Sequence, residues 1–191
     1  AEFSESGGPE RIYRLACRES QSITVDGKAS ETAWQTIPTE TGFGAPWESH
    51  PAPSTSFRAF HSGEYLYFLF QASDPDIIIT AGAPEEVVAS GDRVELFFSR
   101  DPEMKDYYCL EIDPRGKVLD YRASFYRRFD NSWDLAGLRT AGSLTGEGYT
   151  VEAAIPVSWL EESGLSGTAR RDGIFAGIYR AEFSRAGDGG I

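Results

Sequence analysis

The stretch YLYFLFQA at residues 65–72 is apolar on both faces of an extended chain. Side chains alternate between the two faces of a strand, so a strand that is apolar at nearly every position lies in a layer covered on both sides. A turn-forming Ser-Gly-Glu at residues 62–64 precedes the stretch, and residues 56–61 form another strand-like segment. Together these segments predict an antiparallel hairpin at the centre of a β-rich fold.

Further strand-like segments lie on both sides of this hairpin. They are residues 12–18, 22–25, 93–99, 106–112, 117–126, 138–144, 149–155 and 174–183. Turn signals separate them at fairly even spacing, and short helical turns are expected around Trp34 and Trp159. Many short strands with one or two short helices predict an all-β fold, an antiparallel β-sandwich of the jelly-roll or immunoglobulin-like kind.

The length and composition fit one globular domain. The chain has 191 residues without an obvious linker, so residues 1–191 are expected to form a single domain. The net charge of −12 disfavours nucleic acid and anionic membrane surfaces as partners. No stretch approaches the roughly 20 apolar residues that a membrane span needs. Residues 1–6 lack a signal-peptide pattern and are equally compatible with a leader that has been removed.

The cysteines and histidines are few. Cys17 and Cys109 both lie in strand-like segments, and the sequence leaves open whether they form a disulfide or stay as thiols. With only His50 and His61 to assist them, a zinc site is disfavoured. The expected cofactor set is empty, with structural calcium left open and haem disfavoured.

Three consecutive predicted strands each have an apolar face and a polar face. In residues 93–99 and 106–112 the polar face carries rings and acids, among them Glu95, Glu111 and, just after the strand, Asp113. In residues 117–126 we expect Leu119, Tyr121, Ala123 and Phe125 to face the core and Asp120, Arg122 and Tyr126 to join the polar face. Charged groups bond sugar hydroxyls and rings stack on pyranoses, which makes this face a candidate carbohydrate site. The solvated face of any antiparallel sheet gives the same pattern.

Two other functions fit parts of the sequence. A glycoside hydrolase would use an acidic pair from the face that carries Glu95, Glu111 and Asp113. A haem-binding electron-transfer module would use Met104 with His50 or His61 as axial ligands. The sequence contains no Gly-x-Ser-x-Gly, no phosphate loop and no Cys-x-x-Cys-His.

Motifs along most of the chain resemble family 9 carbohydrate-binding modules and their relatives. The opening ITVDGKASETAW at residues 23–34 resembles the family pattern I-x-(I/V)-D-G-x-x-x-E-x-x-W. Matches then follow in the expected order: residues 57–58, 64–67, 92–98, 107–108, 111–116, 120, 133–138, 149–156 and 179–185. The resemblance implies a non-catalytic β-sandwich module that holds a sugar, often the end of a chain. It also implies attachment to, or encoding beside, glycan-degrading enzymes.

The sequence lacks the tryptophans that the resemblance implies for the usual sugar-binding site. Ala89 stands where the resemblance implies one tryptophan of a sugar clamp, and the second clamp tryptophan belongs to a segment beyond Ile191. Trp34 and Trp159 match framework positions and are expected in the core. We therefore expect the loop tryptophans Trp133 and Trp47 to contact sugar. The predicted carbohydrate-binding residues are Trp133, Tyr126, Arg122, Glu111, Asp113 and Trp47.

The sequence as a whole therefore predicts a carbohydrate-binding module without catalytic activity that takes part in polysaccharide breakdown. Its expected partners are a carbohydrate ligand and glycan-degrading enzymes. Its expected location is the periplasm, the cell surface or the exterior of the cell.

Overall fold

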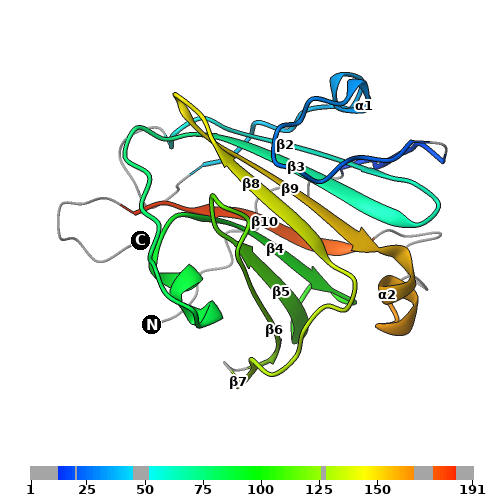
Figure 1. Cartoon of the computed structure of the whole chain (residues 1–191). Helices are drawn as coiled ribbons and strands as arrows, with labels where there is room; N and C mark the ends of the chain where they lie inside the picture. The colour runs from blue at the N-terminus through cyan, green and yellow to red at the C-terminus, as the bar shows by residue number, and fades with distance from the viewer. Residues whose placement is uncertain (1–12, 20, 45–51, 126–127, 166–173, 184–191) are drawn as a thin grey trace.

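The chain forms a sandwich of two β-sheets (Figure 1). A computed structural model describes residues 13–19, 21–44, 52–125, 128–165 and 174–183. The first sheet has the order β1 (Ala16–Cys17), β2 (Thr55–His61), β3 (Tyr65–Ser73), β9 (Gly148–Pro156) and β8 (Arg139–Leu144). The second has the order β10 (Phe175–Ala181), β4 (Arg93–Ser99), β5 (Asp106–Ile112), β6 (Val118–Ser124) and β7 (Arg128–Asp130). The predicted antiparallel sandwich is confirmed, with β1 and β2 as a parallel pair at one edge.

Helical structure within the described ranges is short. Helix α1 (Thr32–Gln35) lies beside the first sheet, and α2 (Val157–Glu162) follows β9 at one end of the sandwich (Figure 1). A 3₁₀ helix, η1 (Glu85–Ser90), precedes β4. No described helix has the length and hydrophobicity that crossing a bilayer requires.

The main core lies between the sheets and takes one parity of each strand. Its buried members include Leu66, Phe68, Val94, Leu96, Leu110, Ile112, Val151 and Ile155. Phe57 and Phe70 add rings from β2 and β3 with centroids 4.9 Å apart. Trp159 closes one end of this core against Phe98 and Tyr108. Alternation along β4 and β5 therefore placed their interior positions correctly.

A second cluster covers the outer face of the first sheet. The segment around α1 packs there, and Trp34, which is 3% exposed, contacts Phe60 edge to face. Its indole Nε1–H donates to the carboxylate of Glu152 at 2.9 Å. The backbone N–H groups of Asp26 and Gly27 donate to the same carboxylate at 3.0 and 2.8 Å. Trp34 is thus a core residue, as expected.

Two predicted elements differ from the structure. Residues 22–25 do not form a strand, because side chains rather than a sheet ladder hold this segment: Glu152 binds the turn that follows it, and the Thr24 N–H donates to Glu31. Trp133 was expected in a loop, yet shortly before it the strand β7 pairs with residues 122–124 of β6. The two cysteines are free thiols, Cys17 exposed and Cys109 buried.

Candidate functional site

The outer face of the second sheet carries the candidate site. The strand register places Glu95 opposite Glu111 and Phe97 opposite Cys109, with Cys109 also opposite Tyr121. None of these side chains belongs to the main core, because their neighbours along each strand fill it. This face therefore combines aromatic rings with two carboxylates.

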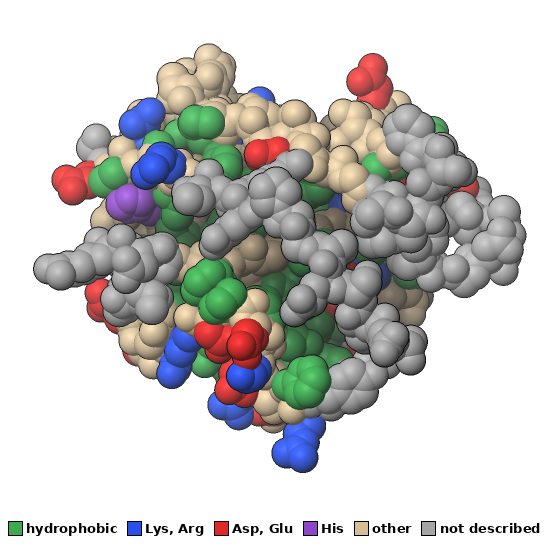
Figure 2. All heavy atoms as spheres, turned by 180° about the vertical axis from the view of Figure 1, so that it is seen from behind, with side chains coloured by type: hydrophobic (Ala, Val, Ile, Leu, Met, Phe, Trp, Pro, Cys, Tyr) green, Lys and Arg blue, Asp and Glu red, His purple; other side chains and the backbone are tan. Residues whose placement is uncertain are grey.

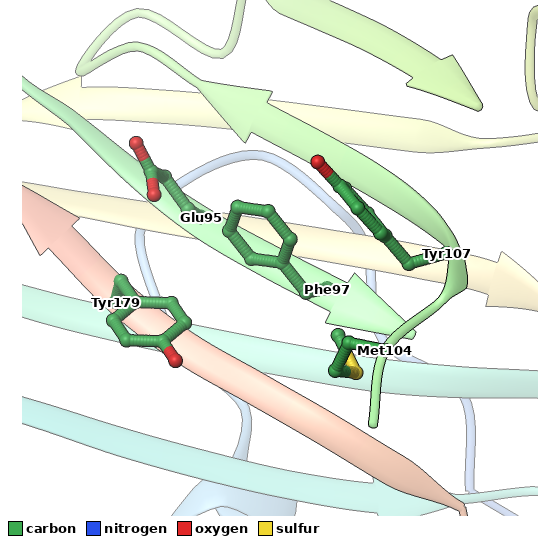
Figure 3. Close-up of a pocket in the computed structure, with 5 residues that line it drawn as sticks. All are labelled: Glu95, Phe97, Met104, Tyr107 and Tyr179. Atoms are coloured by element: carbon green, nitrogen blue, oxygen red, sulfur yellow. The ribbon is translucent and has the colours of Figure 1, made fainter. Parts of the chain in front are cut away.

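An open pocket of about 350 Å³ lies on this face (Figure 3). It is lined by Glu95, Phe97, Met104, Tyr107 and Tyr179. Glu95 and Phe97 come from β4, Tyr107 from β5 and Tyr179 from β10, while Met104 comes from the turn between β4 and β5. The volume lies within the range common for small-ligand sites. Figure 2 shows one face of the molecule, on which hydrophobic side chains gather beside acidic and basic ones.

The ring of Tyr179 depends on the glycine two residues before it. A Cβ added at Gly177 would lie 2.5 Å from Cε2 of the Tyr179 ring. The missing side chain thus leaves room for this ring to fold along β10 toward Phe97, with which it makes an edge contact at 5.5 Å. Tyr179 remains 53% exposed, so a ligand can reach it.

Five rings in contact cross the second sheet from one edge strand to the other. They form the aromatic row, which consists of Tyr179, Phe97, Tyr107, Tyr121 and Phe129. Successive ring centroids in this order lie 5.5, 5.6, 6.5 and 5.4 Å apart. Each strand of the sheet therefore contributes one ring to a continuous apolar band.

Arg93 holds the two carboxylates beside the pocket. Its guanidinium binds Glu95 at 2.8 Å and Glu111 at 2.6 Å. Burial raises the pKa of Glu95 above the ordinary glutamate value; Arg93 opposes this rise and the Glu111 charge adds to it. Glu111 also accepts a hydrogen bond from the Tyr121 hydroxyl at 3.2 Å. Among the described residues, Oε2 of Glu95 has no hydrogen-bond donor, which leaves it available to a ligand hydroxyl.

The same arrangement bears on the hydrolase alternative. A glycosidase needs one carboxylic acid that carries a proton and a second carboxylate with a different role. Here one arginine binds both carboxylates, so the geometry does not assign them different roles. Asp113 does not join them, because its Oδ1 accepts the backbone N–H groups of Arg115 and Lys117 and so fixes the turn after β5.

The register corrects the faces expected for β6. Tyr121 lies opposite Cys109 and Ala123 opposite Tyr107, so these residues share the outer face with Glu111. Arg122 lies opposite Tyr108, which packs against the main core, and its guanidinium binds Asp130 at 2.7 Å. The expectation that Arg122 shares a face with Glu111 is therefore wrong. The parity was misread because β6 is apolar at its outward positions, where η1 covers it with Val88.

The predicted tryptophan and tyrosine ligands lie elsewhere or outside the described ranges. Trp133 packs against Tyr108 at 4.9 Å and Trp159 at 6.0 Å between ring centroids, at the margin of the main core. Tyr126 and Trp47 lie outside the described residues. A role for any of these three in sugar binding stays a prediction from the sequence. Tyr179 and Phe129 were missed, although alternation within residues 174–183 and the Gly-x-Tyr spacing were visible signals for Tyr179.

Two sets of residues offer metal ligands. Oxygen atoms of Glu85, Asp120 and Asp134 lie within 4.8 Å of one another. The buried Asp120 already accepts the Leu135 N–H, and burial raises the pKa of both Glu85 and Asp120. The haem alternative would join Met104 with His61, but Met104 lines the pocket outside the second sheet whereas His61 belongs to the first. His50 lies outside the described residues.

Known proteins resemble this chain in sequence and in fold. A sequence match covers 144 residues, 75% of this chain, at 29% identity to Exoglucanase XynX of Acetivibrio thermocellus, of which the match spans only 12%. A candidate carbohydrate-binding protein from Bacteroides uniformis superposes with a TM-score of 0.62 at 20% identity, covering 78% of this chain and 73% of that one. A family 9 carbohydrate-binding module from Caldicellulosiruptor kristjanssonii, solved with cellotriose, has a TM-score of 0.52 at 17% identity, covering 76% and 68%.

At these identities the structural likeness shows the fold alone. The family is shown by a separate comparison, because residues 25–189 match the sequence profile of the "Carbohydrate family 9 binding domain-like" family. That match takes in the opening motif from Val25, every described strand after it and the whole candidate pocket. The chain therefore belongs to the carbohydrate family 9 binding domain-like family.

Proposed function

We propose that this chain is a non-catalytic module that binds carbohydrate in the pocket formed by Glu95, Phe97, Met104, Tyr107 and Tyr179. The observation that supports this most directly is an exposed tyrosine ring beside a carboxylate that keeps one free oxygen. A pyranose presents apolar C–H groups on its faces and hydroxyls at its edge. The ring can stack on the face while Glu95 accepts a hydroxyl.

The rings of the pocket take the place of the tryptophan clamp that the resemblance implies. Ala89 lies exposed in η1 and offers no ring. Phe97 and Tyr179, in contrast, form an edge contact on neighbouring strands next to Glu95. Affinity for sugar would then come from stacking on Tyr179, with Phe97 and Tyr107 as the apolar floor.

The wider role follows from the relatives. We propose that the module directs a glycan-degrading enzyme to its polysaccharide, and that it acts in the periplasm, at the cell surface or outside the cell. The likeness to a segment of an exoglucanase supports this role. The relative's own activity lies in a protein of which this chain matches 12%, so the enzyme partner of this chain is part of the proposal.

A glycan array followed by calorimetry tests the binding function. Tyr179→Ala is expected to weaken binding of the best ligand by roughly two- to tenfold, because a stacking ring contributes roughly 0.5–1.5 kcal/mol. Glu95→Gln keeps the shape of the side chain but removes the charge, and should also weaken binding. Leu144→Ala, an exposed apolar residue on the first sheet, is the matched control and should bind normally. Normal binding by both pocket variants would contradict this site.

A further inference from the structure

We propose that Phe129 forms a second sugar-stacking position, so that one extended neutral glycan chain lies along the aromatic row from Tyr179 to Phe129. This inference rests on the proposed function, because it extends the same ligand out of the pocket. It assigns a role to an exposed ring at the far edge of the sheet.

The two ends of the aromatic row are equally accessible. Tyr179 is 53% exposed and Phe129 is 52% exposed, and they stand on the two edge strands, β10 and β7. Four steps between neighbouring strands separate these edges, which amounts to about 19 Å at the usual strand spacing. A single sugar cannot contact both rings, whereas an oligosaccharide of several units can.

Phe129 is held in place rather than free at an edge. It lies opposite Ala123 in the β6–β7 pairing, on the same outer face as the pocket. Its ring meets Tyr121 edge to face, at 5.4 Å and 86°. Tyr121 is itself buried and donates its hydroxyl to Glu111, which fixes its position. The ion pair between Arg122 and Asp130 adds a second tie between β6 and β7.

A fixed, exposed ring is what a stacking position requires. Its orientation is set before the ligand arrives, so binding has little ordering cost to offset. Between the two ends the rings of Phe97 and Tyr107 are partly buried, whereas Tyr121 is buried beneath η1 and supports the ring of Phe129. The net charge of −12 disfavours anionic polysaccharides, which leaves neutral chains as the ligand class that fits.

The proposal predicts an affinity that depends on chain length. Calorimetry with β-1,4-linked gluco- and xylo-oligosaccharides of two, three and six units provides the measurement. In the wild type the six-unit chain of the series that binds should bind roughly two- to tenfold more tightly than the two-unit chain, as expected for one additional stacked ring. Phe129→Ala should abolish this gain and leave the affinity for the two-unit chain unchanged. Phe129→Tyr, which keeps the ring, should retain the gain.

The variants distinguish this inference from the function on which it rests. Tyr179→Ala should weaken chains of every length, while Leu144→Ala should weaken none. Equal affinity for all lengths in the wild type would overturn the inference, and so would a length gain that survives in Phe129→Ala. Neither result would affect binding at the pocket. Absence of binding in both series would also overturn the inference, whereas the glycan array decides the proposed function.

Discussion

The outer faces of the two sheets carry similar residues but differ in how many groups bind their glutamate and in how exposed that glutamate is. Each carries aromatic rings beside a glutamate: Trp34, Phe60 and Glu152 on the first sheet, Phe97, Tyr179 and Glu95 on the second. On the first sheet, three N–H groups of the chain itself donate to Glu152, which is completely buried. On the second, Arg93 is the one partner of Glu95 among the described residues, and the Glu95 side chain is 14% exposed.

This difference shows what separates a structural cluster from a binding site. Buried carboxylates need hydrogen-bond donors. On the first sheet the segment around Trp34 packs on the outer face and donates to Glu152. No described segment packs a tryptophan over the pocket of the second sheet, so the ring of Tyr179 and one oxygen of Glu95 remain accessible to a ligand. The residue types alone do not distinguish the two faces, but the number of internal donors does.

The largest expected effect comes from removing the ring that closes the first face. Trp34→Ala deletes a buried side chain and the indole donor to Glu152, and should lower the free energy of unfolding by about 3–5 kcal/mol. Chemical denaturation measures this loss. The folded fraction should still bind sugar with wild-type affinity, because the pocket lies on the other sheet. Lost binding with unchanged stability would place Trp34 in a site instead.

Tyr179→Ala should have the opposite effect to Trp34→Ala, a loss of sugar binding without a loss of stability. Its ring is about half exposed, so little apolar contact is lost on truncation. We expect the denaturation midpoint to stay close to that of the wild type while the affinity for sugar falls. Together the two variants separate stability from binding, one on each face.

Much of the fold was predictable because strand alternation determines it. Residues 93–99 and 106–112 were predicted with the bounds that β4 and β5 have, and the core positions on those strands were correct. The opening motif also identified Trp34 as a framework residue. The strand positions depend on local periodicity, which one sequence contains, whereas the framework role of Trp34 came from the resemblance to the family motif.

The site was less predictable because the pairing register between strands, not the local sequence, determines which residues lie next to one another. The sequence of β6 reads apolar at Leu119, Tyr121 and Ala123, which looks like a core face, yet these residues face outward beneath η1. Only the pairing with β5 shows that Arg122 points to the other side. Trp133 appeared to be a loop ring, but long-range contacts with Tyr108 and Trp159 hold it against the core. No local pattern specifies such contacts.

A third carboxylate, Asp92, is expected to make the free energy of unfolding depend on pH, with an effect of intermediate size. It is completely buried and accepts the backbone N–H groups of Ile78 and Phe183 at 2.5 and 2.6 Å. Burial nevertheless raises its pKa to about 6; the two N–H groups and Arg180 oppose the rise, and Asp74 adds to it. Two backbone N–H groups donate to Asp92, whereas three N–H groups donate to Glu152.

The raised pKa of Asp92 predicts the direction of the pH dependence. The folded state holds this proton up to about pH 6, whereas the unfolded chain releases it near pH 4. The stabilisation that the protonated Asp92 gives to the folded state is therefore complete below about pH 4 and is lost as the pH rises to 6. We expect the free energy of unfolding to fall by about 1–3 kcal/mol over this interval. Denaturation at several pH values measures the slope, and Asp92→Asn should flatten it. An equally steep slope in the variant would assign the effect to other groups.

The smallest expected change tests the open face alone. Gly177 lies on β10 opposite Phe97, and an added Cβ would come within 2.5 Å of the Tyr179 ring. The ring is about half exposed, so Gly177→Ala should displace it toward solvent without disturbing the strand. Removing a glycine from a strand costs no stability in itself, and we expect the free energy of unfolding to change by less than about 1 kcal/mol.

Sugar binding should nevertheless weaken in Gly177→Ala, by up to about tenfold, because the stacking ring no longer lies over the pocket. Calorimetry with the best ligand from the array measures this change. The double variant Gly177→Ala with Tyr179→Ala is the decisive control: once the ring is absent, the added methyl group should have no further effect on affinity. Additive losses in the double variant would mean that Gly177 acts through direct contact with the sugar, not through the position of Tyr179. The outcome therefore distinguishes a site shaped by backbone clearance from one shaped by side-chain contacts alone.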